Sequence, residues 1–439
     1  MNFILALILL FSSDGFAQSA PIKDVFVGGR NGCVSLIDGS IKCWGDNDTG
    51  QLGLGDNTIR GDQPNEMGAN LPTPQLGTGL KIKEYAGGTI HNCALFENGR
   101  VKCWGYNYTG ALGLGHTQTL GRNAGEMGDR LPFVELGTDI KVKHLAVGFY
   151  NTCAVFEDGK IKCWGRNNAG QLGLGDRRDR GDEPGEMGAN LPFIDLGSGE
   201  KVENVWVGRD AICALLQNKK IKCWGYNTNG QLGLGDQQNR GDTPSEMGAN
   251  LPYVDLGQNV DVQSLSMGGN HVCAVTTAMQ IKCWGSNVYG ELGLGDTESR
   301  GDKPNEMGTN LPYVDLGPHE LVVRVATYFE GTCAQLMNRT VKCWGDNLYG
   351  QLGAGHNKRL GDDAGEMGGA LLPIYLGKKQ VVQQVSAGGW NVCAMVGTVA
   401  KPQIKCWGRN TSGQLGLGHT RNVGAAPNEM GDNLPYVEL

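Results

Sequence analysis

The sequence predicts an all-β protein, a seven-bladed β-propeller, and three observations predict it. Near-identical segments recur seven times at a fixed spacing, as in Cys33, Cys93 and Cys153. Each copy contains short segments that alternate apolar and polar residues, separated by glycine-rich turns. The two ends of the chain each carry part of a repeat. A long fixed period indicates units that bury their faces against neighbours, and four-stranded units closed into a ring describe a propeller.

Two cysteines in each copy flank a predicted β-hairpin. In residues 93–103 the hairpin loop is Glu97-Asn98-Gly99, and Gly at the third loop position is typical of a type I turn with a G1 bulge. Counting outward from this turn places Cys93 directly opposite Cys103, within disulfide reach. The repeat predicts seven disulfides, the last of them across a loop that is three residues longer. They are Cys33–Cys43, Cys93–Cys103, Cys153–Cys163, Cys213–Cys223, Cys273–Cys283, Cys333–Cys343 and Cys393–Cys406.

Four strands are expected in each blade. They have the patterns LPxVDLG, KVxxVxxG, CALxxxG and IKCWG. The first blade lacks the Leu-Pro strand, and the chain ends in residues 434–439 with a Leu-Pro strand that no further unit follows. We therefore expect the last strand to complete the first blade and close the ring, which removes exposed sheet edges. An open β-solenoid is the alternative, and it leaves both ends unexplained.

Composition and cysteine usage indicate an exported protein. The net charge of −7 and the absence of a basic run disfavour nucleic acid as a partner. Residues 3–11 are an apolar run too short to span a bilayer, and Gly15-Phe16-Ala17 resembles a cleavage site. We expect a signal peptide at 1–17, a propeller at 18–439, no membrane insertion, and a monomer that is secreted, periplasmic or on the cell surface. Fourteen cysteines that pair by position fit this environment.

The other repeated residues are expected to be structural. The Trp of each CWG triplet alternates with cysteine and should pack between blades, although stacking on a carbohydrate is the alternative. The cysteine spacing and the scattered acidic loops do not predict zinc or calcium, and neither metal nor cofactor is expected. Arg-Gly-Asp recurs at 60–62, 180–182, 240–242 and 300–302, where an Arg–carboxylate contact within the loop is favoured over cell adhesion.

The KCWGxNxxGQLGLG motif carries a family resemblance. It stands at 42–55, 102–115, 162–175, 222–235, 282–295, 342–355 and 405–418, with Ala111, Glu291 and Ala354 as departures. It resembles the repeat of the regulator of chromosome condensation (RCC1) family, and this implies a seven-bladed propeller over 18–439. The nuclear founder exchanges nucleotide on a small GTPase, whereas a secreted bacterial relative inhibits β-lactamase by binding. The signal sequence, the cysteines and the acidic charge depart from the nuclear founder.

Residues that differ between copies are the candidates for function. They stand just before or at the start of the strand that carries the first cysteine, and equivalent positions of a propeller share one rim. We therefore predict a rim that binds an unidentified protein partner through His91, Phe149, Tyr150, Arg209, Asp210, Asn270, His271, Phe329, Glu330, Trp390 and Asn391. The prediction is a binding scaffold without catalysis. A lyase or hydrolase site at the channel mouth and guanine-nucleotide exchange are the alternatives.

Overall fold

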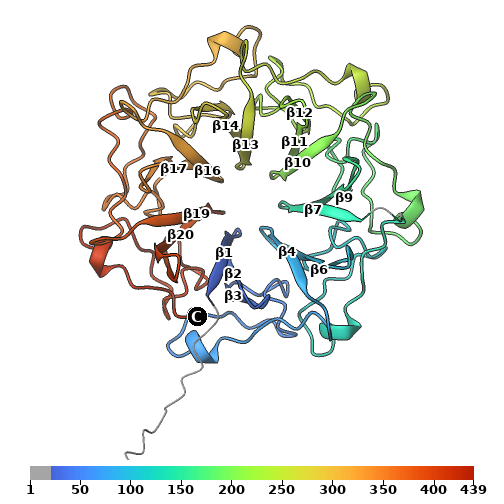
Figure 1. Ribbon diagram of the computed structural model, residues 1–439, viewed down its shortest axis with the longest axis horizontal. Coiled ribbons are helices and arrows are strands. Elements are labelled where there is room, and N and C mark those ends of the chain that lie inside the picture. Colours follow the sequence, from blue (N-terminus) through green and yellow to red (C-terminus); the bar gives the residue numbers. More distant parts are fainter. Residues whose placement is uncertain (1–20, 138, 140) are drawn as a thin grey trace, which may run out of the picture.

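Seven three-stranded antiparallel sheets surround a central axis in the computed structural model, which describes residues 21–137, 139 and 141–439 (Figure 1). Each sheet is one blade, and its first strand lies nearest the axis. The predicted seven-bladed all-β propeller is therefore confirmed. The predicted signal peptide at 1–17 lies outside the described residues. None of the helices in the described part of the chain is long and apolar enough to cross a membrane.

The strands have nearly equal lengths in all blades. The first strands are β1 (Ile22–Val27), β4 (Ile82–Gly87), β7 (Val142–Val147), β10 (Val202–Val207), β13 (Val262–Met267), β16 (Val322–Tyr328) and β19 (Val382–Ala387). The second strands are β2 (Asn31–Leu36), β5 (His91–Phe96), β8 (Asn151–Phe156), β11 (Ala211–Leu216), β14 (His271–Thr276), β17 (Gly331–Leu336) and β20 (Asn391–Thr398). The third strands are β3 (Ile41–Gly45), β6 (Val101–Gly105), β9 (Ile161–Gly165), β12 (Ile221–Gly225), β15 (Ile281–Gly285), β18 (Val341–Gly345) and β21 (Lys401–Gly408).

Short 3-10 helices follow six of the third strands, within the long outer loops. They are η1 (Gly68–Asn70), η2 (Gly128–Arg130), η3 (Gly188–Asn190), η4 (Gly248–Asn250), η5 (Gly308–Asn310) and η6 (Gly431–Asn433).

The hairpin turns set the register that the sequence predicts. Gly99 has φ of +80°, the left-handed conformation that the bulged turn requires. Leu95 then pairs with Val101, and Cys93 pairs with Cys103. All seven predicted cysteine pairs form disulfides, with Cα–Cα distances of 4.0 to 4.1 Å. The predicted hairpin and disulfide pattern is confirmed.

The Leu-Pro segments are not strands, so the expectation of four strands in each blade is wrong. Six of the seven segments make a single backbone hydrogen bond to the third strand of their own blade, as from Val134 N to Val101 O at 2.8 Å. In the first blade Pro74 occupies the donor position and has no N–H to give. One bond per segment is too few for a ladder, and the segment instead runs along the edge of the third strand.

The last Leu-Pro segment does not complete the first blade as a strand, which corrects the second expectation, although its Glu438 O accepts a hydrogen bond from Gly68 N of the first repeat at 3.1 Å. Val437 N bonds Ile404 O at 2.8 Å, so this segment belongs to the seventh blade. The GQLGLG loop of every repeat reaches the Trp of the next blade. At the closure, the loop after the seventh blade reaches the first blade, where Trp44 Nε1 donates to Gln414 O at 3.0 Å.

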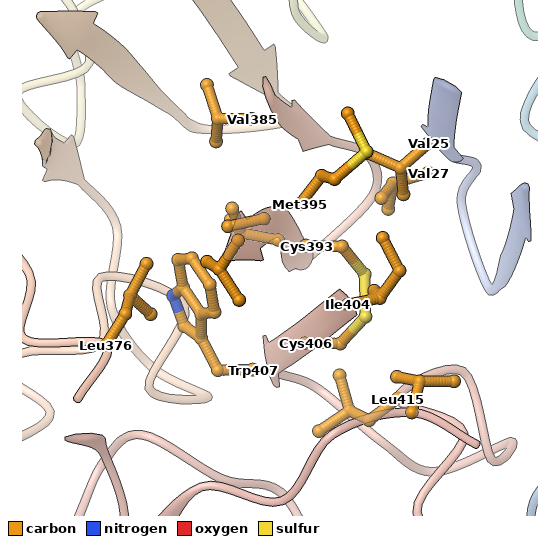
Figure 2. Close-up of a cluster of buried hydrophobic side chains, with 14 of the residues drawn as sticks. Val25, Val27, Leu376, Val385, Cys393, Met395, Ile404, Cys406, Trp407 and Leu415 are labelled. Carbon is orange, nitrogen blue, oxygen red and sulfur yellow. A yellow bond between two sulfur atoms is a disulfide. The ribbon is translucent and has the colours of Figure 1, made fainter. Parts of the chain in front are cut away.

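Each interface between blades has an apolar core built around one Trp of a CWG triplet. All seven of these Trp side chains are fully buried. Figure 2 shows the core where the ring closes, with Trp407 and the Cys393–Cys406 disulfide pointing to opposite sides, and with Val25 and Val27 of β1 on the disulfide side. The predicted role of these Trp residues as packing between blades is confirmed.

Candidate protein-binding face

The predicted site residues gather at one rim of the propeller, in the turns that join the first and second strands of each blade. In the first blade this turn is held by a hydrogen bond from Gly28 N to Asn31 O at 2.8 Å, and the other blades repeat it. Arg209 is exposed there. The half-buried members are Phe149, Tyr150, Asp210, Asn270, Phe329, Glu330 and Trp390.

Three predicted residues do not face this rim. His91, His271 and Asn391 each begin a second strand and are buried, with exposed fractions of 0 to 1%. His91 Nε2 lies 2.8 Å from Thr152 Oγ1 in the next blade, and His271 Nε2 lies 3.0 Å from Thr332 Oγ1. The two histidine side chains join neighbouring blades, and because all three residues are buried, none of them can contact a partner. The alternation of faces along a strand explains the error, because these residues lie one step past the exposed turn.

Aromatic rings of the turns form a continuous contact across the channel mouth. Phe149 of the third blade stacks on Phe329 of the sixth, with ring centroids 5.6 Å apart and an interplanar angle of 25°. Phe149 also contacts Tyr150 at 4.5 Å, and Phe329 meets Trp390 edge to face at 4.7 Å. Two of these rings come from opposite sides of the ring of blades, so together they cover the axis at this end.

Residues that the sequence reasoning missed extend this contact outward. They lie just after the third strands and beside the turns. For example, Tyr106 N donates a hydrogen bond to Ile90 O, in the turn of the same blade, at 3.0 Å. Tyr106 contacts both Tyr150 and Tyr108, and Tyr349 contacts Trp390 at 6.2 Å. We use the term aromatic belt for the seven connected rings. They are Tyr106, Tyr108, Phe149, Tyr150, Phe329, Tyr349 and Trp390.

Arginines lie over the belt. The guanidinium of Arg166 is 5.1 Å from the centre of the Tyr150 ring. Arg409 lies over both Trp390, at 4.9 Å, and Tyr349, at 5.2 Å. Cation–π contacts of this kind keep the rings in place and leave part of each guanidinium available to acidic groups.

Acidic groups are interspersed with these arginines. Arg166 Nη1 lies 3.2 Å from Asp210 Oδ1, and Glu330 Oε2 accepts a hydrogen bond from Trp390 Nε1 at 3.3 Å. Burial raises the pKa of Glu330, and the hydrogen bond from Trp390 acts in the opposite direction. The rim therefore offers aromatic, basic and acidic groups together.

Large apolar side chains are exposed at one repeated position of the same rim. Tyr108, Val288 and Leu348 are 64%, 57% and 63% exposed. Each is the first residue after the Asn of WGxN in its own repeat. A signal for these residues was present in the sequence, because this position also varies from copy to copy.

The Arg-Gly-Asp tripeptides lie in the outer loops, and their arginines are already engaged. Arg180 Nη2 lies 2.6 Å from Asp176 Oδ2 and Nη1 donates to Arg178 O at 2.8 Å. Arg60, Arg240 and Arg300 make the equivalent contacts. The favoured interpretation, an Arg–carboxylate contact that braces the loop, matches this geometry.

Potential metal ligands do not cluster in the described structure. Among residues 21–137, 139 and 141–439, no group of three or more His, Cys, Asp or Glu side chains is placed to hold a metal ion.

Comparison with family models identifies the repeat. A model described as the regulator of chromosome condensation (RCC1) repeat matches residues 22–51, 86–111, 142–171, 204–231 and 262–291. A second RCC1 repeat model matches residues 38–95 and 223–275. This chain belongs to the RCC1 repeat family. The resemblance carried by its KCWGxNxxGQLGLG motifs is confirmed.

Relatives of known identity share the repeat at moderate identity. The ultraviolet-B receptor UVR8 of Arabidopsis thaliana is 29% identical over 72% of this chain and 63% of its own length. The mitochondrial RCC1 domain-containing protein RUG3 of the same plant is 31% identical over 58% of this chain and 52% of its own length. The alignments span less than two thirds of either relative.

Solved structures show the same fold. Yeast RCC1 (Prp20), in a crystal structure bound to Kap60, has a TM-score of 0.64 and 18% identity over 99% of this chain and 91% of that chain. Human WBSCR16 has a TM-score of 0.63 and 17% identity over 90% of this chain and 93% of that chain. Both matches show that this chain shares their fold.

Proposed function

We propose that this RCC1 propeller is an exported scaffold that acts without catalysis, as a monomer, by binding a protein partner through the rim that carries the aromatic belt. The observation that carries the proposal is the belt itself, whose rings connect Tyr108 to Tyr349 across the channel mouth. Aromatic and arginine side chains are the residues that contribute most to protein interfaces. A rigid ring of disulfide-linked blades presents them with little loss of conformational entropy.

Export is part of the proposal. Seven disulfides form and persist in oxidising environments, and this supports a location outside the cytosol. The family supports binding in general, since one relative of known structure, Prp20p of Saccharomyces cerevisiae, binds Gsp1p and histones.

The opposite rim provides a matched control surface. It consists of the hairpin turns between second and third strands, and it also exposes apolar side chains. Ile37 is 66% exposed and Met337 is 51% exposed, values close to those of Tyr108 and Leu348. Any binding that depends only on exposed apolar area would therefore use both rims.

Photo-crosslinking tests the choice of rim. A photoreactive phenylalanine analogue would replace Tyr108 or Leu348 on the belt side and Ile37 or Met337 on the control side. We expect cross-links to a single, identifiable partner from the first two positions and not from the other two. Cross-linking from Ile37 and Met337 with none from the belt side would overturn the proposal.

A further inference from the structure

The channel inside the ring of blades contains a cavity. It lies on the inner side of the aromatic belt, away from the outer face that is proposed to bind a protein partner. The cavity has a volume of about 490 Å³ and is lined by the first strands. This volume lies within the range of about 300–1,000 Å³ that is typical of small-molecule sites. A second hollow, of about 290 Å³, shares Phe26, Glu84 and Arg324 with it and extends to the hairpin turn at residues 37–39. The cavity therefore opens toward the rim opposite the belt.

Hydrogen bonds between blades narrow the channel at the belt end. Phe149 N bonds Gly208 O at 3.4 Å, and Phe329 N bonds Gly389 O at 3.2 Å. At another of these contacts, a Cβ on Gly388 would stand 2.0 Å from Gly28 O, so the blades meet backbone to backbone. The stacked rings of Phe149 and Phe329 line the cavity from this end. The result is a cup with an aromatic floor.

The wall of the cup carries polar donors without partners. The guanidinium of Arg324 on β16, an exposed residue at the open end, makes no hydrogen bond or ion pair with any described residue and offers five N–H groups. The indole N–H of Trp206 on β10 and the amide NH2 of Asn204 are likewise without an acceptor among the described residues. All three side chains belong to residues that line the cavity.

Acceptors on the wall are fewer and partly engaged. Glu84 Oε2 lies 3.4 Å from His144 Nδ1. The hydroxyls of Ser266 and Thr327 lie 2.8 Å apart and bond each other. The unpaired groups of the wall are thus mainly donors, and a donor-rich wall favours a ligand that is rich in acceptors. A guanidinium is well matched to a carboxylate, which it can bind through two parallel hydrogen bonds.

We infer that the channel cup binds a small carboxylic acid with an apolar or aromatic body. Its carboxylate pairs with Arg324, near the open end. Its body lies against Phe26 and Trp206 on the walls and reaches toward the rings of Phe149 and Phe329. The chain supports this placement of Arg324 at the open end and of Phe329 at the floor. The two residues are five apart in sequence, which corresponds to about 16 Å along an extended strand. The inference is independent of the proposed protein partner, which would contact the outer face of the belt.

Calorimetric titration of the full protein with 3-phenylpropionate tests the inference, with the neutral 3-phenylpropionamide as the matched probe. We expect the acid to bind and Arg324→Gln to lower its affinity at least tenfold, because a charged hydrogen-bonded pair is lost, while the weaker binding of the amide stays unchanged. Ala146→Phe adds a ring to the cavity wall and should abolish binding of both the acid and the amide. Arg30→Gln is the control, since Arg30 is an exposed arginine outside the cavity lining.

Circular dichroism and thermal unfolding would establish that each variant is folded, and Trp206→Phe supplies a second test that retains an aromatic ring. It should weaken binding of the acid and of the amide alike, because the body of each ligand lies against the larger indole ring. Equal affinities for acid and amide, no effect of Arg324→Gln, or no binding of the acid would each overturn the inference. None of these results tests the proposed protein-binding role of the belt, because that role is tested by cross-linking to the protein partner.

Discussion

Trp44 of the first blade donates its indole hydrogen bond to the backbone oxygen of Gln414, 370 residues along the chain. Trp224 makes the same bond to Gln171 O at 2.9 Å, between two blades that are consecutive in the chain. The interface that closes the ring is therefore built like the interfaces inside it. The closing contact requires no strand exchange between the first and last repeats.

Removing this one hydrogen bond should lower the free energy of unfolding by the same amount at both interfaces. We expect Trp44→Phe and Trp224→Phe each to lower the free energy of unfolding by about 1–3 kcal/mol, from the orphaned carbonyl and the smaller ring. Urea unfolding followed by circular dichroism would measure both. A Trp44→Phe variant as stable as the parent, beside a destabilised Trp224→Phe, would mean that the ring is not closed in this way.

The sixth repeat has a gap that the other repeats fill. Its GQLGLG loop carries Ala354 where the other six have Leu, and a cavity of about 540 Å³ lies there between the sixth and seventh blades. Leu352, Ile374 and Met430 are among its lining residues. Ala354→Leu should raise the free energy of unfolding by about 1 kcal/mol, because it covers exposed apolar surface.

The reverse change in the preceding repeat is the control for this prediction. Leu294 packs against the core of the sixth blade, so Leu294→Ala should lower the free energy of unfolding by about 1–2 kcal/mol. Denaturant midpoints of the two variants should move in opposite directions. A loss of stability in Ala354→Leu would show that the gap is already closed in solution.

Two buried histidines should make the protein sensitive to acid. Burial lowers the pKa of His91 and of His271 to about 3, from an ordinary value of 6.5. The unfolded chain binds these protons first as pH falls. Their contribution to stability is therefore complete above pH 6.5 and is lost progressively as pH falls toward 3. By pH 4.5 the loss is roughly 2–3 kcal/mol for each histidine.

Asparagine occupies the same place as His91 in three other blades, at Asn31, Asn151 and Asn391, and provides a matched substitution. The His91→Asn, His271→Asn double variant should show a flatter dependence of the free energy of unfolding on pH between 6.5 and 4. Denaturant unfolding at a series of pH values measures this. An unchanged slope would mean that both imidazoles reach solvent in the folded protein.

The disulfides should resist reduction in the folded state, because all fourteen cysteines are at most 3% exposed. Native protein treated with reduced glutathione and then with iodoacetamide should gain no label by mass spectrometry, whereas denatured and reduced protein should label fully. Removing one pair with Cys93→Ser and Cys103→Ser should cost about 2–3 kcal/mol in the chain-entropy description. Labelling of the native protein would argue against a disulfide-linked ring.

Local rules were sufficient to predict the hairpins. The position of Gly99 determined the register, and the register determined the partner of Cys93. The Leu-Pro segments were harder, because a short apolar segment does not show which strand it will lie beside. Val437 could equally have completed the first blade, and only the three-dimensional path shows that it contacts Ile404.

Alternation along the third strand concealed the role of a lysine that is buried in six of the seven blades. Lys102 reads as an outward-facing polar residue, yet it is 1% exposed. Its Nζ donates to Leu76 O at 2.8 Å and to Gly128 O at 2.9 Å, and it lies 4.7 Å from the centre of the Phe133 ring. These partners come from two separate loops, between β3 and β4 and between β6 and β7, and a single sequence does not show that the loops converge.

The rim could be predicted in part because equivalent positions of a closed ring share one face. That argument located Phe149, Phe329 and Trp390 correctly. It failed for His91, since it ignored the change of face between the turn and the next strand. It also missed Tyr106, because residues after the third strand return to the same rim only once the blade has folded.

Hydrogen exchange of the protein alone and with its cross-linked partner, once that partner is identified, tests the central claim most directly. We expect the partner to slow exchange in peptides that contain the turns of the belt, such as residues 148–151 and 328–331, and in those that contain residues 106–109 and 346–349. The hairpin turns at 37–39 and 337–339 should exchange at the same rate in both states. Slower exchange confined to those hairpin turns, with the belt unchanged, would contradict the account.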